Sequence, residues 1–200
     1  KEQDLLNYIE ELKKGQVHNI LALRGDKPRD MSQDDFDNRY YHHASELVTA
    51  IRQNGGFSIA GACYPEQHPE AASLPEDIAN LKKKVDQGVD FLITQLFYDN
   101  EKFFRFVEQA RKAGIEVPIT AGLMPITAPS QIHNIIALSG CSVPVALQKI
   151  LDQYKESPAD LKKAGLEYTK QQMDSLLAHG VDGIHIYSMN KVDIATTLLN

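Results

Sequence analysis

Short apolar runs recur along the chain, and most of them are continuous rather than alternating. They are rich in β-branched and aromatic residues, which favour strands, and they cover residues 19–23, 57–62, 91–97, 117–123 and 183–188. A continuous apolar run is typical of a strand that is buried on both faces, as in a parallel sheet. The sequence therefore predicts five parallel strands.

Apolar residues at helical spacing fill the segments between these runs. The expected helices cover residues 44–53, 76–87 and 101–113, and three more before the last strand cover residues 129–138, 145–154 and 159–179. An apolar stripe from Leu5 to Leu12, ended by Gly15, predicts that the chain opens in an amphipathic helix with no strand before it. Regular alternation of strand and helix predicts β/α units.

Two folds contain such units, the doubly wound sheet and the closed barrel. A doubly wound dinucleotide fold carries a glycine-rich GxGxxG turn after its first strand, and this sequence has none. A barrel places polar chemistry at the carboxyl ends of several strands, and polar residues follow each predicted strand here. We therefore expect residues 1–200 to form one domain of the α/β (β/α)₈ TIM-barrel type. It would be a partial barrel of about five β/α units, with extra helices before the last strand.

Composition narrows the classes of partner. The formal net charge of -6 argues against a nucleic-acid surface, which needs clustered Lys and Arg. The two cysteines, Cys63 and Cys141, show no CxxC spacing, so neither a disulfide framework nor a cysteine zinc site is indicated. No apolar stretch approaches the roughly 20 residues of a membrane span. We expect a cytoplasmic protein.

The polar segments that follow the strands also carry a family resemblance. The segments Leu21–Asp26 (LALRGD), Ala62–Glu70 (ACYPEQHPE), Ile93–Asp99 (ITQLFYD) and Ala121–Ile126 (AGLMPI) resemble methylenetetrahydrofolate reductases in order and spacing. The resemblance runs from about residue 19 to residue 191. It implies an enzyme that binds FAD, takes a hydride from NADH or NADPH onto flavin N5, and reduces 5,10-methylenetetrahydrofolate to 5-methyltetrahydrofolate by a ping-pong mechanism.

The resemblance also implies roles for particular residues. Asp26 would act in catalysis, because a carboxylate near the flavin lowers its reduction potential and also holds the folate pterin in a cationic iminium form. FAD would be bound by Arg24, Gly25, Asp26, His43, Ala44, Tyr64, His68, Asp77, Asn80 and Lys84. Folate or nicotinamide would be bound by Gln95, Gln131 and Lys191.

Two of these expectations have a second reading. Asp77, Asn80 and Lys84 fall at i, i+3 and i+7 on one face of a predicted helix, which suits contacts to an extended cofactor but also suits a solvated helix edge. Gln95 lies inside a predicted strand, where an amide without hydrogen bonds costs about 1–3 kcal/mol. A polar ligand in the barrel mouth would satisfy Gln95, and so would a water in the core.

The resemblance has one main departure, at the start of the chain. Members of the family carry a general-acid glutamate on a strand that would precede Lys1, and further strands there supply a threonine and a histidine to the flavin site. We therefore expect this chain alone to be catalytically impaired.

Two alternatives to a reductase stay open. One is a folded, non-catalytic fragment that self-associates as a homo-oligomer to cover the edges of an incomplete barrel. The other is a metal-dependent barrel hydrolase, although the first predicted strand has no HxH pair. Its candidate ligands are His42, His43, His68, His185, Asp26 and Glu66.

Overall fold

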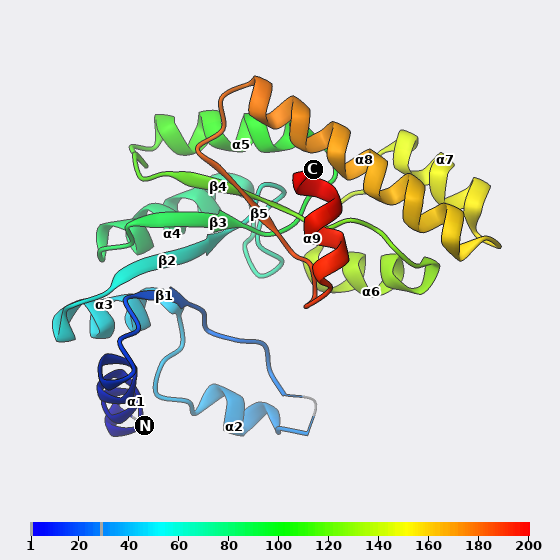
Figure 1. The fold of residues 1–200 in the computed structure, drawn as a ribbon. Helices are drawn as coiled ribbons and strands as arrows, with labels where there is room; N and C mark the ends of the chain where they lie inside the picture. Colours follow the sequence, from blue (N-terminus) through cyan, green and yellow to red (C-terminus); the bar gives the residue numbers. More distant parts are fainter. Residues whose placement is uncertain (1, 29) are drawn as a thin grey trace.

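The computed structural model describes residues 2–28 and 30–200, apart from the side chains of residues 133, 134, 137 and 138. The strands are β1 (Asn19–Ala22), β2 (Ser58–Cys63), β3 (Phe91–Thr94), β4 (Ile119–Leu123) and β5 (Gly183–Ile186). All neighbours pair in parallel, and their order in space, β1-β2-β3-β4-β5, follows the chain (Figure 1). Because each strand lies beside the one before it, with no reversal of direction across the sheet, the arrangement is that of part of a barrel rather than a doubly wound fold.

Helices connect the strands as the apolar periodicity predicts. They are α1 (Glu2–Lys14), α3 (Ala44–Asn54), α4 (Leu74–Asp86), α5 (Asn100–Lys112), α6 (Pro129–Ser139), α7 (Val145–Tyr154) and α8 (Pro158–Ala178). Side chains set some of their starts: Ser73 accepts a hydrogen bond from Glu76 N before α4, and Asp99 accepts one from Glu101 N before α5. None of the helices in the described part of the chain is long and apolar enough to cross a membrane.

Two short helices were not predicted. The helix α2 (Gln33–Asp37) has five residues, none of them buried, so it leaves no apolar stripe in the sequence. The helix α9 (Val192–Leu199) follows the last strand after a short loop over residues 187–191 and buries Ile194 and Leu198. Segments this short are marginal alone, and tertiary contacts rather than local pattern stabilise them.

The strand predicted over residues 91–97 is shorter than expected, because β3 ends at Thr94. The three residues Leu96 to Tyr98 are apolar for a different reason, since they are buried beyond the strand. Phe97 stacks on Phe103 of α5, with ring centroids 5.0 Å apart. The apolar run over residues 91–97 therefore indicated buried residues correctly but overestimated the length of the strand.

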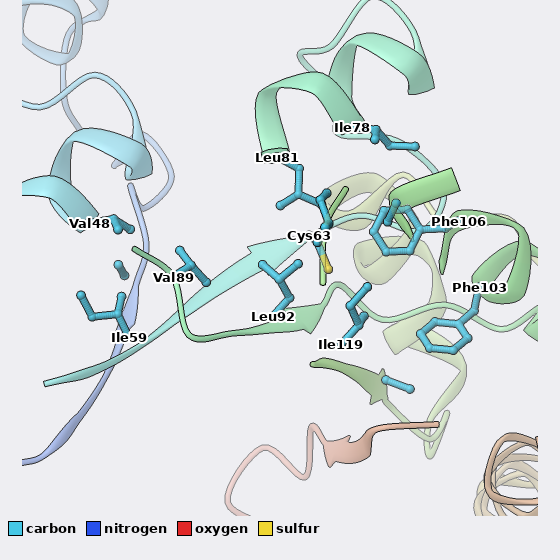
Figure 2. Close-up of a cluster of buried hydrophobic side chains, with 14 of the residues drawn as sticks. Val48, Ile59, Cys63, Ile78, Leu81, Val89, Leu92, Phe103, Phe106 and Ile119 are labelled. Carbon is cyan, nitrogen blue, oxygen red and sulfur yellow. The ribbon is translucent and has the colours of Figure 1, made fainter. Parts of the chain in front are cut away.

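The two faces of the sheet differ in burial. Ala22, Leu92 and Ile119 lie on one face, in register through Gly61, and are at most 3% exposed. This face packs against the connecting helices in a core that includes side chains of α3, α4 and α5 (Figure 2). Met173 and Leu176 of α8 belong to the same core. The other face begins with Leu21 of β1, which is 42% exposed. Apolar burial is thus concentrated on the helix-covered face.

The same aspartate-to-backbone hydrogen bond occurs at the amino-terminal ends of two strands. The sequence Gly-Val-Asp occurs before β3 and before β5, ending in Asp90 and Asp182. The Oδ2 atom of Asp90 accepts hydrogen bonds from Ile59 N at 2.7 Å and from the guanidinium of Arg52 at 2.8 Å. Asp182 accepts in the same way from Ile119 N at 2.8 Å. Each aspartate ties its strand to the neighbouring strand, at the end of the sheet opposite the predicted site.

Candidate active site

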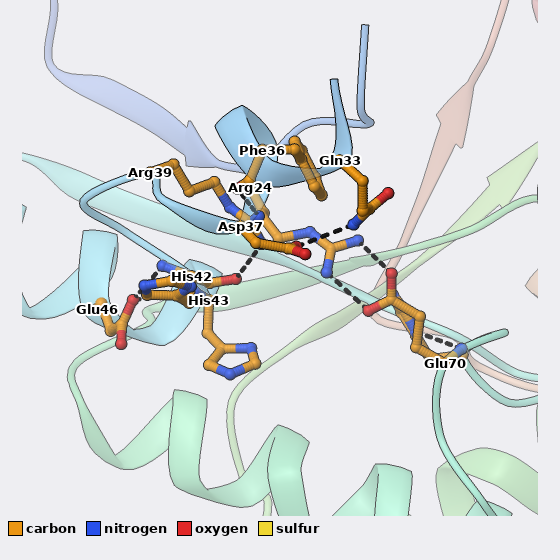
Figure 3. A network of polar contacts seen from close by, with 10 residues as sticks. Arg24, Gln33, Phe36, Asp37, Arg39, His42, His43, Glu46 and Glu70 are labelled. Atoms are coloured by element: carbon orange, nitrogen blue, oxygen red, sulfur yellow. Dashed lines mark hydrogen bonds and ion pairs between the residues drawn. The ribbon is translucent and has the colours of Figure 1, made fainter. Parts of the chain in front are cut away.

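The segment after β1 contributes Arg24, Gly25 and Asp26. The guanidinium of Arg24 forms a bidentate ion pair with Glu70, at 2.6 Å from Nη1 to Oε2 and 2.8 Å from Nη2 to Oε1 (Figure 3). This hydrogen-bonded pair raises the pKa of Arg24 and lowers that of Glu70. Gly25 has a φ of 77°, a region that an L side chain rarely adopts, and it turns the chain toward the exposed carboxylate of Asp26.

The loop after β2 brings Tyr64, His68 and Asp77 together. The backbone N–H of His68 donates to Asp77 Oδ2 at 2.8 Å, and the rings of Tyr64 and His68 meet edge to face with centroids 4.6 Å apart. Burial raises the pKa of Tyr64, and the negative charge of Asp26 raises it further, so the β1 and β2 segments share one electrostatic environment. Burial also raises the pKa of Asp77, which is half-buried.

The predicted trio on α4 divides in the structure. Lys84 turns inward and donates from Nζ to the carbonyl oxygen of Ala62 on β2, and its burial lowers its pKa. Asn80 is exposed and accepts a hydrogen bond from its neighbour Lys83. Asp77 and Lys84 therefore face the end of β2, whereas Asn80 lies on the solvent side of the helix.

The carboxyl ends of β3, β4 and β5 meet around Thr94. Its Oγ1 accepts a hydrogen bond from Gly122 N at 2.8 Å, and its carbonyl accepts one from the hydroxyl of Tyr187 at 2.9 Å. Burial raises the pKa of Tyr187 to about 12, so its hydroxyl keeps its proton at neutral pH and donates the hydrogen bond. Gly122 is required here, because a Cβ at this position would lie 2.2 Å from Thr94 O.

Gln95 stands one residue beyond β3 rather than inside a strand, which corrects the sequence-based placement. The alternation along β3 puts it on the same face as Phe91 and Ile93, and it is half-buried. Its Oε1 accepts a hydrogen bond from Leu96 N at 2.9 Å. Within the described part of the chain no residue accepts from its amide nitrogen, which leaves a donor for a polar ligand.

The remaining predicted residues stand at helix starts after β1, β4 and β5. His43 is exposed immediately before α3, Ala44 opens that helix, and Lys191 is exposed immediately before α9. Gln131, in the first turn of α6, is held by its own loop: its Oε1 accepts from the backbone N–H and hydroxyl of Thr127. No contact found among residues 2–28 and 30–200 joins Gln131 or Lys191 to the group around Arg24 and His68.

Sequence reasoning named Glu66 only as a candidate metal ligand and did not predict the contacts that fix the loop over residues 64–70. Glu66 accepts a hydrogen bond at its Oε1 from Ser142 N, at 3.1 Å, and forms an ion pair with Lys102. Glu70 pairs with Arg24 on the other side. Two glutamates spaced four apart around His68 were visible in the sequence, but partners 36 to 76 residues away were not.

The site offers donors and acceptors to a polar ligand rather than to a metal ion. In residues 2–28 and 30–200, no three His, Cys, Asp or Glu side chains converge into a group that could hold a metal. The hydrolase alternative is therefore left without a ligand set in these residues. Arg24, Tyr64, His68 and Asp77 instead supply a cation, a hydroxyl, an imidazole and a half-buried carboxylate around one pair of strand ends.

Fold and site together define an α/β protein of the barrel type whose polar residues gather where its parallel strands end. The model of the methylenetetrahydrofolate reductase family matches residues 1–200, and the chain belongs to this family. This confirms the resemblance that the motifs after β1, β2, β3 and β4 indicated.

Named relatives agree with this assignment. A protein of Arabidopsis thaliana named methylenetetrahydrofolate reductase (NADH) 1 is 35% identical over 195 residues, covering 91% of this chain and 33% of the relative. The 5,10-methylenetetrahydrofolate reductase of Escherichia coli K12 is 32% identical, covering 90% of this chain and 58% of the relative. A probable methylenetetrahydrofolate reductase (NADPH) of Caenorhabditis elegans is 37% identical, covering 94% and 28%. The chain thus spans between 28% and 58% of the length of these relatives.

Solved structures give weaker matches. An uncharacterized protein from Clostridium thermocellum, described as binding two copies of 5-methyl-5,6,7,8-tetrahydrofolic acid, matches with a TM-score of 0.49 and 21% identity over 78% of this chain and 57% of that one. A dihydrodipicolinate synthase from Rhodopseudomonas palustris matches with a TM-score of 0.48 and 11% identity over 99% and 62%. Matches at these scores carry no argument about the chemistry of this chain.

Proposed function

We propose that residues 1–200 form a single partial-barrel unit of a methylenetetrahydrofolate reductase, which reduces 5,10-methylenetetrahydrofolate to 5-methyltetrahydrofolate with NADH or NADPH. The observation that carries the proposal is the membership of the whole chain in the family, together with the gathering of the matching motifs at the carboxyl ends of neighbouring strands. Relatives are named for both nicotinamides, so both are kept as co-substrates.

The residues at these strand ends fit FAD as the resident cofactor. Within the residues that the structure describes, the hydroxyl of Tyr64 and the amide nitrogen of Gln95 have no hydrogen-bond partner, although both side chains are partly buried. Both groups are therefore available to hydrogen-bond a polar ligand. FAD would be held by Arg24, Gly25, Asp26, His43, Ala44, Tyr64, His68, Asp77, Asn80 and Lys84. When bound, it stores reducing equivalents between oxidation of the nicotinamide and reduction of the folate, which gives ping-pong kinetics.

The charged and polar side chains of the site would then contact different parts of the ligands. Arg24 supplies a fixed positive charge, and the half-buried Asp77 accepts from hydroxyl donors such as those of a sugar chain. Asp26, which is exposed and two residues from Arg24, would hold the N–H donors of a pterin. Gln95 would bind folate by donating from Nε2, since Leu96 N already occupies its Oε1.

Gln131 and Lys191 complete the proposed substrate contacts. Gln131 must exchange its hydrogen bonds to Thr127 for a ligand, whereas the exposed ammonium of Lys191 can meet an anionic group directly.

The test is the visible absorption of the purified chain after incubation with FAD and removal of unbound cofactor. A retained flavin band that bleaches under anaerobic NADH or NADPH supports the proposal. Asp77→Asn should weaken retention, because it removes a half-buried carboxylate, and Asp86→Asn on the exposed side of α4 should not. The proposal for this unit is contradicted if the wild-type chain, incubated with saturating FAD, shows no flavin band after the unbound cofactor is removed.

A second candidate function is self-association without turnover. Leu21 of β1 and Leu23, just after this strand, are 42% and 51% exposed, and β1 pairs only with β2 in the described part of the chain. An exposed apolar edge strand favours pairing with another chain. A homo-oligomer in light scattering that becomes monomeric in Leu21→Lys would support this, and a wild-type monomer would contradict it.

Both cysteines, Cys63 and Cys141, are free and buried. Free thiols fit a reducing compartment, and we place the protein in the cytoplasm as part of the proposal.

A further inference from the structure

The loop over residues 64–70 is fixed from two sides by its two glutamates. Glu66 is only 11% exposed and is bound by Lys102 of α5 and by Ser142 N, before α7. Glu70 is 61% exposed and reaches across to Arg24, after β1. Between these two anchors lies His68, so the position of its ring depends on both.

Glu70 acts on His68 through its backbone as well. The backbone N–H of Glu70 donates to Nδ1 of His68 at 3.0 Å. A neutral imidazole accepts at one ring nitrogen and carries its proton on the other. Accepting at Nδ1 therefore selects the tautomer with hydrogen on Nε2, and within the described residues nothing bonds to Nε2.

We propose that Glu70 is a positioning residue: its ion pair with Arg24 orients that guanidinium and holds the loop so that His68 presents Nε2–H to an acceptor atom of a bound cofactor. The inference rests on the proposed function and extends it to a residue that contacts the cofactor only through others. One residue would thus set two cofactor contacts that come from different strand ends.

The energetics favour a role in orientation over a role in stability. An ion pair with one partner this exposed contributes little to folding. Its bidentate geometry, with both N···O distances below 3 Å, nevertheless fixes the plane of the guanidinium and the direction of the carboxylate. A variant that loses the pair should therefore fold normally and still bind cofactor less well.

The experiment compares Glu70→Gln with Glu101→Gln, a control at an exposed glutamate whose side chain has no described partner. The first readout needs no cofactor: long-range ¹H–¹⁵N NMR at pH 8 reports which nitrogen of His68 carries the proton, with the signal assigned by its loss in His68→Asn. We expect the Nε2–H signature in wild type and Glu101→Gln, and averaging of both tautomers in Glu70→Gln.

The second readout is FAD affinity, from quenching of flavin fluorescence. Glu70→Gln should bind FAD about 5- to 10-fold more weakly, which corresponds to one hydrogen bond of ordinary net strength, with an unchanged melting temperature. An unchanged His68 signature and unchanged FAD affinity in Glu70→Gln would overturn the inference while leaving the proposed function intact. If wild type takes up no FAD, the proposed function and the cofactor part of the inference both fall. The NMR signature then still decides whether Glu70 sets the ring.

Discussion

Gly165 of α8 lies directly against the backbone of Ile126, in the segment that follows β4. A Cβ built on Gly165 would lie 1.9 Å from the carbonyl oxygen of Ile126 and 3.0 Å from its carbonyl carbon. The neighbouring Thr127 holds Gln131 through its backbone N–H and hydroxyl. We predict that Gly165→Ala destabilises the protein by separating α8 from this segment.

Two opposing effects set the magnitude. Alanine is better than glycine inside a helix by about 1 kcal/mol, which by itself would stabilise α8. Against this, the helix or the segment must move by at least about 1 Å to clear backbone atoms that cannot rotate away, and such overpacking costs typically about 1–3 kcal/mol or more. With a cost near the top of that range, the net loss is about 2 kcal/mol, which lowers the melting temperature of a chain of this size by roughly 4–8 °C.

The assay is thermal unfolding followed by circular dichroism, together with urea unfolding at 25 °C. The matched control is Lys163→Ala, an exposed position in the same turn of α8, which should stay within about 0.5 kcal/mol of wild type. If Gly165→Ala melts at or above the wild-type temperature, the gain in helix propensity exceeds the cost of overpacking. The close approach to Ile126 then does not constrain the fold.

Two further predictions concern buried polar contacts. Asp90→Asn should lower stability by about 1 kcal/mol at pH 7, because the carboxylate accepts from Ile59 N and Arg52. Burial pushes the pKa of Asp90 up, but the hydrogen bonds from Ile59 N, Arg52 and Ser58 and the positive charge of Arg52 outweigh it, so the net pKa is lowered. In urea unfolding, the difference from wild type should therefore be full above about pH 3.9, shrink as the pH falls below this value, and be lost once the pH is below the lowered pKa of the folded state. Thr94→Val should cost about 1–3 kcal/mol, because it leaves Gly122 N buried without an acceptor, as urea unfolding can measure.

Each of these variants has a matched control in the same chain. Asp86→Asn removes a carboxylate from an exposed i,i+4 pair on α4 and should change stability by less than about 0.5 kcal/mol. Thr196→Val removes a hydroxyl from the exposed side of α9 and should likewise change stability by less than about 0.5 kcal/mol. A Thr94→Val chain as stable as Thr196→Val would contradict the proposed role of the Thr94 hydroxyl. An Asp90→Asn difference that does not shrink as the pH is lowered below about 3.9 would contradict the ionic role of Asp90.

Local pattern was sufficient for the elements that bury a face. The apolar stripes of α4 and α5 and the continuous runs of β2 and β4 located those elements to within one or two residues. Pattern failed where apolar residues are buried outside regular structure, as at Phe97, and where a helix buries too little to leave a stripe, as in α2. Both failures have one cause: an apolar pattern reports which residues are buried, and buried residues occur in loops as well as in helices and strands.

The candidate site divides in the same way. The resemblance proposed Arg24, Tyr64, His68, Asp77 and Gln95 as site residues. The structure places Arg24, Tyr64 and Gln95 within two residues of a strand end, His68 in the loop after β2, and Asp77 in the first turn of α4. The structure separated Asn80 from Lys84, although both fit the same helical spacing, because only the latter reaches the carbonyl of Ala62.

The sequence by itself determined the alternation of strands and helices, the family, and which residue types stand at the strand ends, since these follow from local periodicity and from short motifs. Only the tertiary structure decided which charges meet. Glu70 pairs with Arg24 across 46 residues, and Ser142 N binds Glu66 across 76. Such pairings depend on parallel strands bringing their carboxyl ends to one edge, and spacing along the chain does not encode them.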